Sequence, residues 1–105
     1  MKMIRAIIRP EKEEEVVKGL ETAGFPSVTK MDVFGRGKQK GIQVGTAVYD
    51  ELAKTMIMVV VEDAMVEKAS GAIIQAAKTG NFGDGKLFVS SVDSASTIRT
   101  GKTGL

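Results

Sequence analysis

The sequence predicts an α+β fold, in which a sheet of four strands carries two helices on one face. Strand-like patterns occupy four short segments, at residues 2–9, 27–35, 54–62 and 86–92. Helix-like spacing of apolar residues occupies two longer segments between them, so the order along the chain is β-α-β-β-α-β. With 105 residues, 43% of them hydrophobic and 27% charged, the chain has the size and composition of one globular domain over residues 1–105.

Residues 2–24 predict the first strand and the first helix. In residues 2–9, apolar positions alternate with Arg5 and Arg9, which is the pattern of a half-buried strand. The apolar positions of this strand are Ile4, Ala6 and Ile8. Pro10 then opens a helix with a glutamate-rich first turn, and Gly24 predicts its end. The apolar stripe of this helix consists of Val16, Val17, Leu20 and Ala23.

Residues 54–80 predict the third strand and the second helix. The β-branched run in residues 54–62 is typical of a central strand. Residues 62–80 begin with acidic residues and end near Lys78, with Gly80 beyond the helix. The apolar positions of this helix are Met65, Val66, Ala69, Ile73 and Ala76. Together with a last strand at residues 86–92, this order predicts a ferredoxin-like sandwich with both helices on one face of the sheet.

The segment of residues 35–54, between the second and third predicted strands, is too long for an ordinary hairpin turn. One interpretation is a mobile insertion or an extended hairpin, and the other is a long interaction loop. Its glycines permit unusual backbone angles, and its stem is basic through Arg36, Lys38 and Lys40. The pattern alone leaves both interpretations open.

The composition excludes several kinds of chemistry. The chain has no histidine, cysteine or tryptophan, which rules out imidazole acid–base chemistry, disulfides, and metal sites built on thiolate or histidine. Its formal net charge of +2 says little about nucleic acid, and we expect no nucleic-acid partner. No apolar run approaches a membrane span, and Arg5 and Arg9 interrupt the first apolar run. We therefore expect a cytoplasmic protein without direct membrane insertion.

The stretch TGNFGDGKLFVSS, residues 79–91, contains the spacing Gly-x-x-x-x-Gly-Lys of a Walker-type phosphate loop. Leu87 replaces the metal-binding Ser or Thr, and the stretch leads from a helix into a strand, so the Walker interpretation fails. One alternative is an ordinary turn with Lys86 on the surface. The other is an anion-binding nest of glycine amides, with cations from Lys86 and Arg99 and a contribution from neighbouring subunits of a small cyclic oligomer.

Three segments together resemble the PII family of nitrogen-signalling proteins. They are GRGKQKG at 35–41, TGNFGDGKLFV at 79–89 and IRTGKTG at 98–104, and their order and spacing match over essentially the whole chain. The resemblance implies a homotrimer, or a mixed assembly with a PII paralogue, that has nucleotide sites at the subunit clefts. It also implies that ATP or ADP binds there, and that 2-oxoglutarate joins through Mg²⁺ when ATP is present.

The resemblance also assigns site residues by position. Those implied to bind nucleotide are Thr29, Gly37, Lys38, Val60, Gly83, Asp84, Gly85, Lys86 and Arg99. Those implied to bind 2-oxoglutarate are Gln39, Lys40, Gly41 and Lys54. Lys54 would pair with the distal carboxylate of 2-oxoglutarate, and Gln39 would supply a side-chain oxygen to Mg²⁺.

Two departures from the family pattern bear on function. Thr97 stands where many relatives have a phosphate-binding arginine, which predicts weaker ATP binding or a shifted balance between ATP and ADP. Tyr49 does not match the tyrosine that is uridylylated in many bacterial relatives, so we expect no uridylylation. A compact, unmodified loop resembles the NifI branch, whose members act beside a second paralogue to inhibit nitrogenase when 2-oxoglutarate is low.

The leading hypothesis is therefore a non-enzymatic sensor that regulates a partner protein, nitrogenase, through its long loop. The alternative within the family is a GlnK-like regulator of an ammonium channel or glutamine synthetase, although the candidate loop tip at residues 43–48 has no arginine. RNA recognition would need aromatic residues that the third strand lacks. For catalysis no base is evident, since Asp84 among glycines is better interpreted as a turn-forming or amide-capping residue. The methionines expected to fill the core are Met31, Met56, Met58 and Met65.

Overall fold

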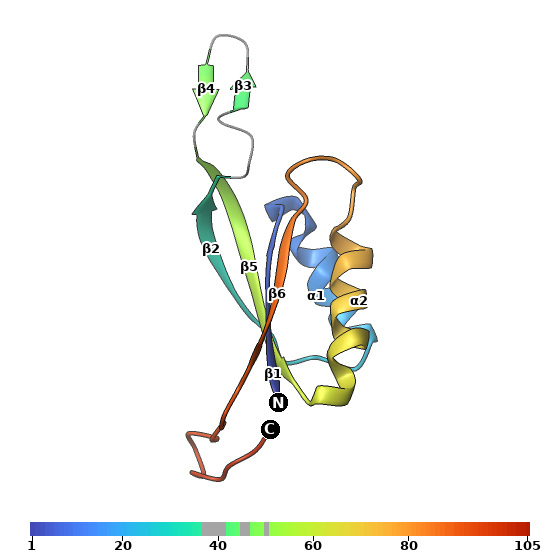
Figure 1. The fold of residues 1–105 in the computed structure, drawn as a ribbon, viewed down its shortest axis with the longest axis vertical. Coiled ribbons are helices and arrows are strands. Elements are labelled where there is room, and N and C mark those ends of the chain that lie inside the picture. Colours follow the sequence, from blue (N-terminus) through green and yellow to red (C-terminus); the bar gives the residue numbers. More distant parts are fainter. Residues whose placement is uncertain (37–41, 45–46, 50) are drawn as a thin grey trace.

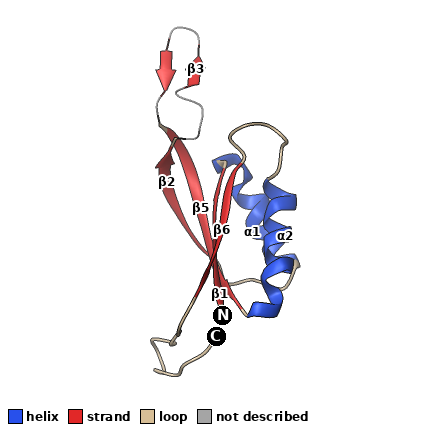
Figure 2. Ribbon diagram, in the orientation of Figure 1, coloured by secondary structure: helices blue, strands red, loops and turns tan. Residues whose placement is uncertain are grey.

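The computed structural model describes residues 1–36, 42–44, 47–49 and 51–105 of the chain. Four strands form one antiparallel sheet in the order β2-β5-β1-β6. These strands are β1 (Lys2–Ile8), β2 (Thr29–Gly35), β5 (Leu52–Val61) and β6 (Gly85–Ser91). The helices α1 (Glu13–Thr22) and α2 (Val66–Ala77) lie side by side on one face of the sheet (Figures 1 and 2). The predicted α+β, ferredoxin-like fold is confirmed.

The core lies between the helices and the sheet, where the period of each element turns one set of side chains inward. In β1, every second side chain is buried, as the alternation predicts. The buried apolar residues are Ile4, Ala6 and Ile8 in β1, Ile57, Val59 and Val61 in β5, Val16 and Leu20 in α1, and Ala69, Ile73 and Ala77 in α2. Burial of the β-branched run of β5 explains why this strand lies inside the sheet rather than at its edge.

A buried polar contact attaches the start of α1 to the sheet. Thr55 of β5 is only 1% exposed, and its hydroxyl donates to Oε2 of Glu13 at 3.3 Å. Oε1 of Glu13 pairs with Lys30 of β2 at 2.6 Å. The hydrogen bond from Lys30 is the main reason that the pKa of the Glu13 carboxyl lies below its ordinary value. Glu13 thereby connects α1 with two adjacent strands.

The helices are shorter than the sequence predicts. Each begins with a 3₁₀ turn, η1 (Pro10–Lys12) before α1 and η2 (Asp63–Met65) before α2. Gly24 ends α1 as predicted: it has a φ of 100°, its amide donates to Glu21, and the Phe25 amide donates to Leu20. Among the described residues, no helix is long and apolar enough to cross a membrane.

The end of α2 agrees with the prediction. The helix stops at Ala77, Lys78 already has extended backbone angles, and Gly80 lies beyond the helix in the following loop. Ala77 is buried, whereas the predicted core residue Met65 is 42% exposed because it lies in the 3₁₀ turn before the helix. Helical periodicity alone does not distinguish a short 3₁₀ turn from the first turn of an α-helix.

The connection between β2 and β5 contains an extended hairpin. Its strands β3 (Ile42–Val44) and β4 (Ala47–Tyr49) pair antiparallel and form a separate two-stranded sheet. They lie beyond the upper ends of β2 and β5 in Figure 1. One of the two open interpretations of this segment included an extended hairpin, which the backbone pairing supports.

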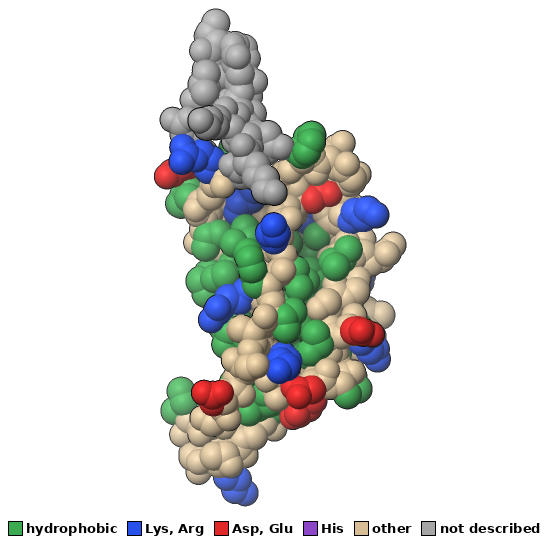
Figure 3. Space-filling view, in the orientation of Figure 1, with side chains coloured by type: hydrophobic (Ala, Val, Ile, Leu, Met, Phe, Trp, Pro, Cys, Tyr) green, Lys and Arg blue, Asp and Glu red, His purple; other side chains and the backbone are tan. Residues whose placement is uncertain are grey.

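The face of the sheet opposite the helices carries many apolar side chains beside Arg5, Lys54 and Lys86, and it is not covered by any element that the structure describes. Partners in adjacent antiparallel strands share a face, so the register identifies the residues of this outer face. Its apolar residues are Met3, Ile7, Met31, Val33, Leu52, Met56, Met58, Val60 and Phe88. Figure 3 shows hydrophobic side chains over the middle of the molecule with Lys and Arg among them.

The methionine prediction is therefore wrong for the single chain. Met31 is 41% exposed, and Met56 and Met58 are half-buried on the outer face rather than in the core. The β-strand period places these residues opposite the buried positions of the same strands. Apolar side chains in this arrangement suit a surface that is covered by another chain.

The residues after β6 form an arm that extends beyond the sheet. Ser96 and Thr103 form an isolated bridge, and the Thr97 amide donates to the Lys102 carbonyl at 2.8 Å. In Figure 1 this arm lies at the lower end of the molecule, near the amino terminus. Ile98 is fully exposed on it, so the arm contributes nothing to the core of its own chain.

Candidate functional site

The loop between α2 and β6 is closed by the side chain of Asp84. One carboxylate oxygen, Oδ2, accepts hydrogen bonds from the amides of Thr79 at 2.8 Å and Gly80 at 2.9 Å. The other oxygen, Oδ1, accepts a hydrogen bond from the Thr79 hydroxyl, which itself accepts the Asn81 amide at 3.2 Å. Asp84 is therefore the amide-capping residue that one interpretation of the sequence predicts, and it joins the two ends of the loop.

Two cationic side chains attach this loop to the sheet. Arg9 donates through Nε to Oδ1 of Asp84 at 3.1 Å and through Nη2 to the Phe82 carbonyl at 2.7 Å. Lys54 donates through Nζ to the Gly83 carbonyl. These contacts use the carboxylate and the carbonyl oxygens of the loop rather than its amides.

The strand register explains why these side chains meet. Thr55, Ile8 and Gly85 lie opposite one another on the adjacent strands β5, β1 and β6. One residue further toward the same end of the sheet come Lys54, Arg9 and Asp84. Residues far apart in the chain are thus placed in a row across three strands.

The electrostatics of the row follow from these contacts. Hydrogen bonds from the hydroxyl and the amide of Thr79, with further ones from Gly80 and Arg9, hold the pKa of the Asp84 carboxyl well below its usual range. Burial lowers the pKa of the Lys54 ammonium, and the charge of Arg9 lowers it further. An anion that bound beside Lys54 would offset both effects and favour its protonated form.

Glycines let the loop and the sheet approach each other closely. Gly80, Gly83 and Gly85 all have positive φ angles, of 89°, 95° and 109°. A Cβ atom on Gly85 would lie 1.7 Å from the Ile7 carbonyl oxygen, and one on Gly83 would lie 3.3 Å from Nη2 of Arg9. Positive φ angles at glycines are the backbone conformation that the predicted anion nest requires, whereas the amides of Thr79 and Gly80 already donate to Asp84.

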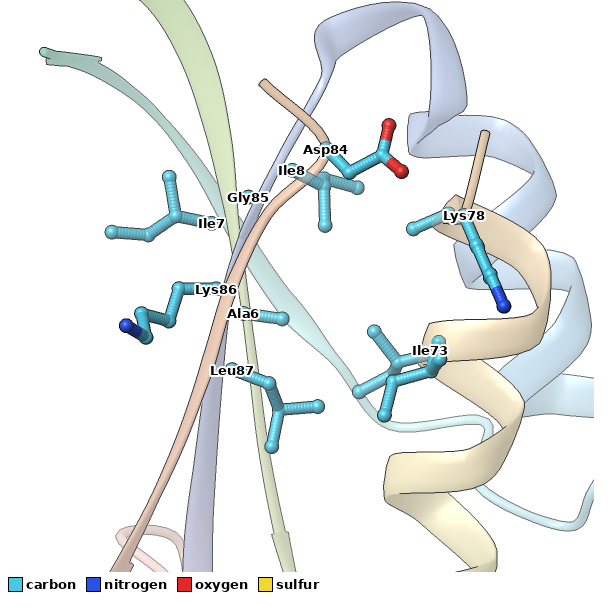
Figure 4. Close-up of a pocket in the computed structure, with 11 residues that line it drawn as sticks. Ala6, Ile7, Ile8, Ile73, Lys78, Asp84, Gly85, Lys86 and Leu87 are labelled. Atoms are coloured by element: carbon cyan, nitrogen blue, oxygen red, sulfur yellow. The ribbon is translucent and has the colours of Figure 1, made fainter. Parts of the chain in front are cut away.

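The remaining predicted residues of the sheet lie on the outer face. Lys86 is exposed and points away from α2 (Figure 4). Thr29 pairs with Met58, and Val60 pairs with Met3, so both also belong to the outer face. Val60 lies six positions along β5 from Lys54, which corresponds to about 20 Å. The adenosine and phosphate positions implied by the family resemblance therefore share one face of the sheet.

An apolar pocket lies on the opposite side of the sheet from these residues. It encloses about 150 Å³ between β6 and α2. Figure 4 shows Ile8, Leu87 and Ile73 facing into this space, with Lys78 at its rim. Because its walls are mainly apolar, this pocket does not have the polar groups that a polyphosphate requires.

The structure does not bring every predicted residue to the loop. The carboxyl-terminal arm, which contains Arg99, lies at the end of the molecule away from the loop in Figure 1. Gly37, Lys38, Gln39, Lys40 and Gly41 lie outside the described residues. Within the described part of the chain, no group of three or more Asp or Glu side chains is arranged to hold a metal ion.

The sequence pattern gives no binding role to two residues of this site, Arg9 and Thr79. The alternation in residues 2–9 predicts only a solvent-facing position for Arg9. Arg9 lies just before Pro10, at the end of a central strand. This position is only a weak indication of a role at the loop, because an ordinary surface arginine would give the same sequence pattern. The spacing from Thr79 to Asp84 is the stronger signal, because a short carboxylate commonly accepts hydrogen bonds from nearby loop amides.

Comparison with known proteins agrees with the fold and the loop. The family model described as Nitrogen regulatory protein P-II matches residues 1–102. The chain is 60% identical to "Nitrogen fixation nifHD2 region GlnB-like protein 1" of Methanosarcina barkeri, over the full length of both chains. It is 56% and 58% identical to nifHD region GlnB-like proteins of Methanothermobacter marburgensis and Methanococcus maripaludis, again over full length.

The chain belongs to the P-II family of nitrogen regulatory proteins. The names of these relatives associate them with nitrogen fixation regions, in agreement with the predicted resemblance to the NifI branch. The family is thus confirmed by both the family model and the close relatives.

The close approach of Gly85 to β1 predicts a measurable difference between two glycines. We expect Gly85→Ala to lower the free energy of unfolding by about 3 kcal/mol or more, because the new Cβ collides with the Ile7 carbonyl and the φ angle is unfavourable. Gly80→Ala is the matched control: its φ is also positive, but its Cβ would meet nothing within 4 Å, so about 1–2 kcal/mol is expected. Urea unfolding of both variants measures the difference, and equal losses would contradict this description of the loop.

Proposed function

We propose that the chain is a cytoplasmic, non-enzymatic sensor of nitrogen status. ATP or ADP binds at residues 83–86, 2-oxoglutarate joins with Mg²⁺, and the connection between β2 and β5 regulates a partner protein, nitrogenase. The observation that carries the proposal is the glycine loop closed by Asp84 and flanked by Arg9, Lys54 and Lys86. Membership of the P-II family and the nitrogen-fixation names of its relatives support the same conclusion.

The loop has the groups that a polyphosphate requires. Amides between positive-φ glycines would form an electropositive concavity, and Lys86 would add a formal charge on the outer face. Thr29 and Val60 would line the adenosine part of the same face. Asp84 is fully used as an acceptor of loop hydrogen bonds, so it is not free to act as a catalytic base. This occupation supports a binding role rather than catalysis.

The second effector would occupy the neighbourhood of Lys54. A carboxylate there would pair with an ammonium group that is partly removed from water, and low solvation strengthens such a pair. Gln39, Lys40 and Gly41 would complete the site for 2-oxoglutarate, and Gln39 would contribute an oxygen to Mg²⁺. The nucleotide phosphates would supply further oxygen ligands to the ion, which explains a requirement for nucleotide before 2-oxoglutarate binds.

The nucleotide site would be completed by a neighbouring chain. Within one chain, Arg99 lies at the other end of the molecule from the loop, so its predicted contact with phosphate requires another copy (Figure 1). The apolar outer face of the sheet is a suitable surface for such an assembly. We propose a homotrimer, or a mixed assembly with a PII paralogue.

Regulation would follow from a difference in ligand affinity between two states of the long connection. The ligands can shift the partner interaction only as far as they bind one of these states more tightly than the other. The connection leaves and re-enters the sheet beside Lys54, because β2 and β5 are neighbours. A ligand at Lys54 is therefore well placed to influence it.

The ternary site predicts that 2-oxoglutarate binds tightly only when Mg-ATP is present. We expect Lys54→Gln to weaken 2-oxoglutarate binding by at least about tenfold, because it removes a charge-assisted contact. Lys78→Gln is the matched control, since Lys78 is an exposed lysine near the same loop, and it should bind normally. Isothermal titration calorimetry measures both. Equal binding heats with and without nucleotide would refute the ternary site.

The proposed trimer would cover the outer face of the sheet. We expect Met56→Asp to dissociate it, because a carboxylate opposite Ile7 and Met31 would have to be buried between apolar side chains. Lys18→Glu on the exposed surface of α1 changes charge on the other side of the molecule and should leave the assembly intact. Sedimentation velocity measures the mass of each variant, and a monomeric wild-type chain at micromolar concentration would contradict the proposed assembly.

A further inference from the structure

We propose that Arg9 neutralises Asp84 and is thereby the residue that allows a polyphosphate to bind beside this carboxylate. Arg9 lies outside the glycine motif, and the proposed role is that of a positioning residue. This inference rests on the proposed nucleotide site at residues 83–86.

The need for a counter-charge follows from the position of Asp84. The residue lies between Gly83 and Gly85, in the middle of the amides that would hold a polyphosphate. Its contacts to Thr79 and Gly80 favour the ionised carboxylate. A full negative charge at this place would repel phosphate. The loop therefore needs the Asp84 carboxylate in order to stay closed. A bound phosphate, however, needs the negative charge of Asp84 to be compensated.

Arg9 meets both requirements. Its guanidinium spans the loop with two donors, one to Asp84 and one to the Phe82 carbonyl. The Arg9 and Asp84 side chains are each only 24% exposed, so their attraction is less screened than that of a surface pair. Arg9 also follows directly on β1, a strand inside the sheet, so the backbone that carries the guanidinium is held in place by the strand pairing.

The other cations near the loop do not replace it. Lys54 donates to the Gly83 carbonyl rather than to the carboxylate, and Lys86 points away from α2 on the outer face. The absence of a side chain on Gly83 is part of the same arrangement, because a Cβ there would lie 3.3 Å from Nη2 of Arg9. The geometry therefore gives Arg9 and Asp84 a joint role. The effects of substituting the two residues on the free energy of ATP binding should be strongly coupled.

The test is a double-mutant cycle read with nucleotides of increasing charge. Arg9→Gln should weaken ATP binding at least about tenfold, ADP binding less and AMP binding least, because repulsion grows with the number of phosphate charges. The single variant Asp84→Asn completes the cycle. The double variant Arg9→Gln, Asp84→Asn removes both charges, whereas the Asn side-chain oxygen can still accept the Thr79 and Gly80 amides that close the loop. The double variant should therefore recover most of the ATP affinity. Arg9→Lys keeps the positive charge but loses the planar pair of donors that contact Asp84 and Phe82. The ATP affinity of this variant should therefore lie between those of wild type and Arg9→Gln. Lys78→Gln controls for loss of one positive charge nearby.

Calorimetry with Mg-free AMP, ADP and ATP measures the cycle, and thermal melting shows whether each variant is folded. The proposal would be overturned if Arg9→Gln lost the same affinity for all three nucleotides. It would also be overturned if the double variant lost as much ATP affinity as the two single variants combined. Either result would leave Arg9 a purely structural role. Unchanged ATP binding by a folded Arg9→Gln variant would also overturn the proposal. A wild-type chain that binds no nucleotide would instead overturn the proposed function, and this inference with it.

Discussion

The closure of residues 79–84 by the Asp84 carboxylate is the interaction on which the rest of the site depends. A loop with several positive-φ glycines has little intrinsic preference for one shape, because glycine loses more conformational freedom on folding than other residues. One carboxylate that accepts two amides and a hydroxyl provides that shape locally. Arg9 and Lys54 then attach the shaped loop to two strands inside the sheet. This closure fixes where the loop amides lie relative to Lys86 on the outer face.

The sheet order turns this local arrangement into a possible sensor. Because β5, β1 and β6 are neighbours, the loop lies beside Lys54, and β5 also forms one side of the connection that would bind the partner. The outer face carries both the predicted nucleotide residues and the apolar side chains suited to assembly. Ligand binding and subunit contact would therefore involve the same surface. A single chain would have only part of the proposed site, since the carboxyl-terminal arm that contains Arg99 lies away from the loop (Figure 1).

Sequence patterns predict those features that depend on short-range periodicity. The alternation in residues 2–9 correctly places Ile4 and Ile8 in the core, and Gly24 correctly ends α1. Sequence patterns fail where the position of a side chain depends on the pairing of strands that are far apart in the chain. Met56 and Met58 are apolar enough for a core, but strand period and register place them on the face without helices. Arg9 looks like a surface residue until the register brings it beside Asp84, and only the family resemblance assigns roles to Thr29 and Val60.

The exchange of the Thr79 and Gly80 amides with solvent deuterium tests the closure most directly. Both amides donate to a carboxylate in an exposed loop, so slow exchange would have no other source among the described contacts. We expect both to be protected in the wild-type chain and to lose that protection in Asp84→Ala, while the core amides of β1 stay protected. Rapid exchange of both amides in the wild-type chain would contradict the account, because the loop would then lack the shape that binding requires.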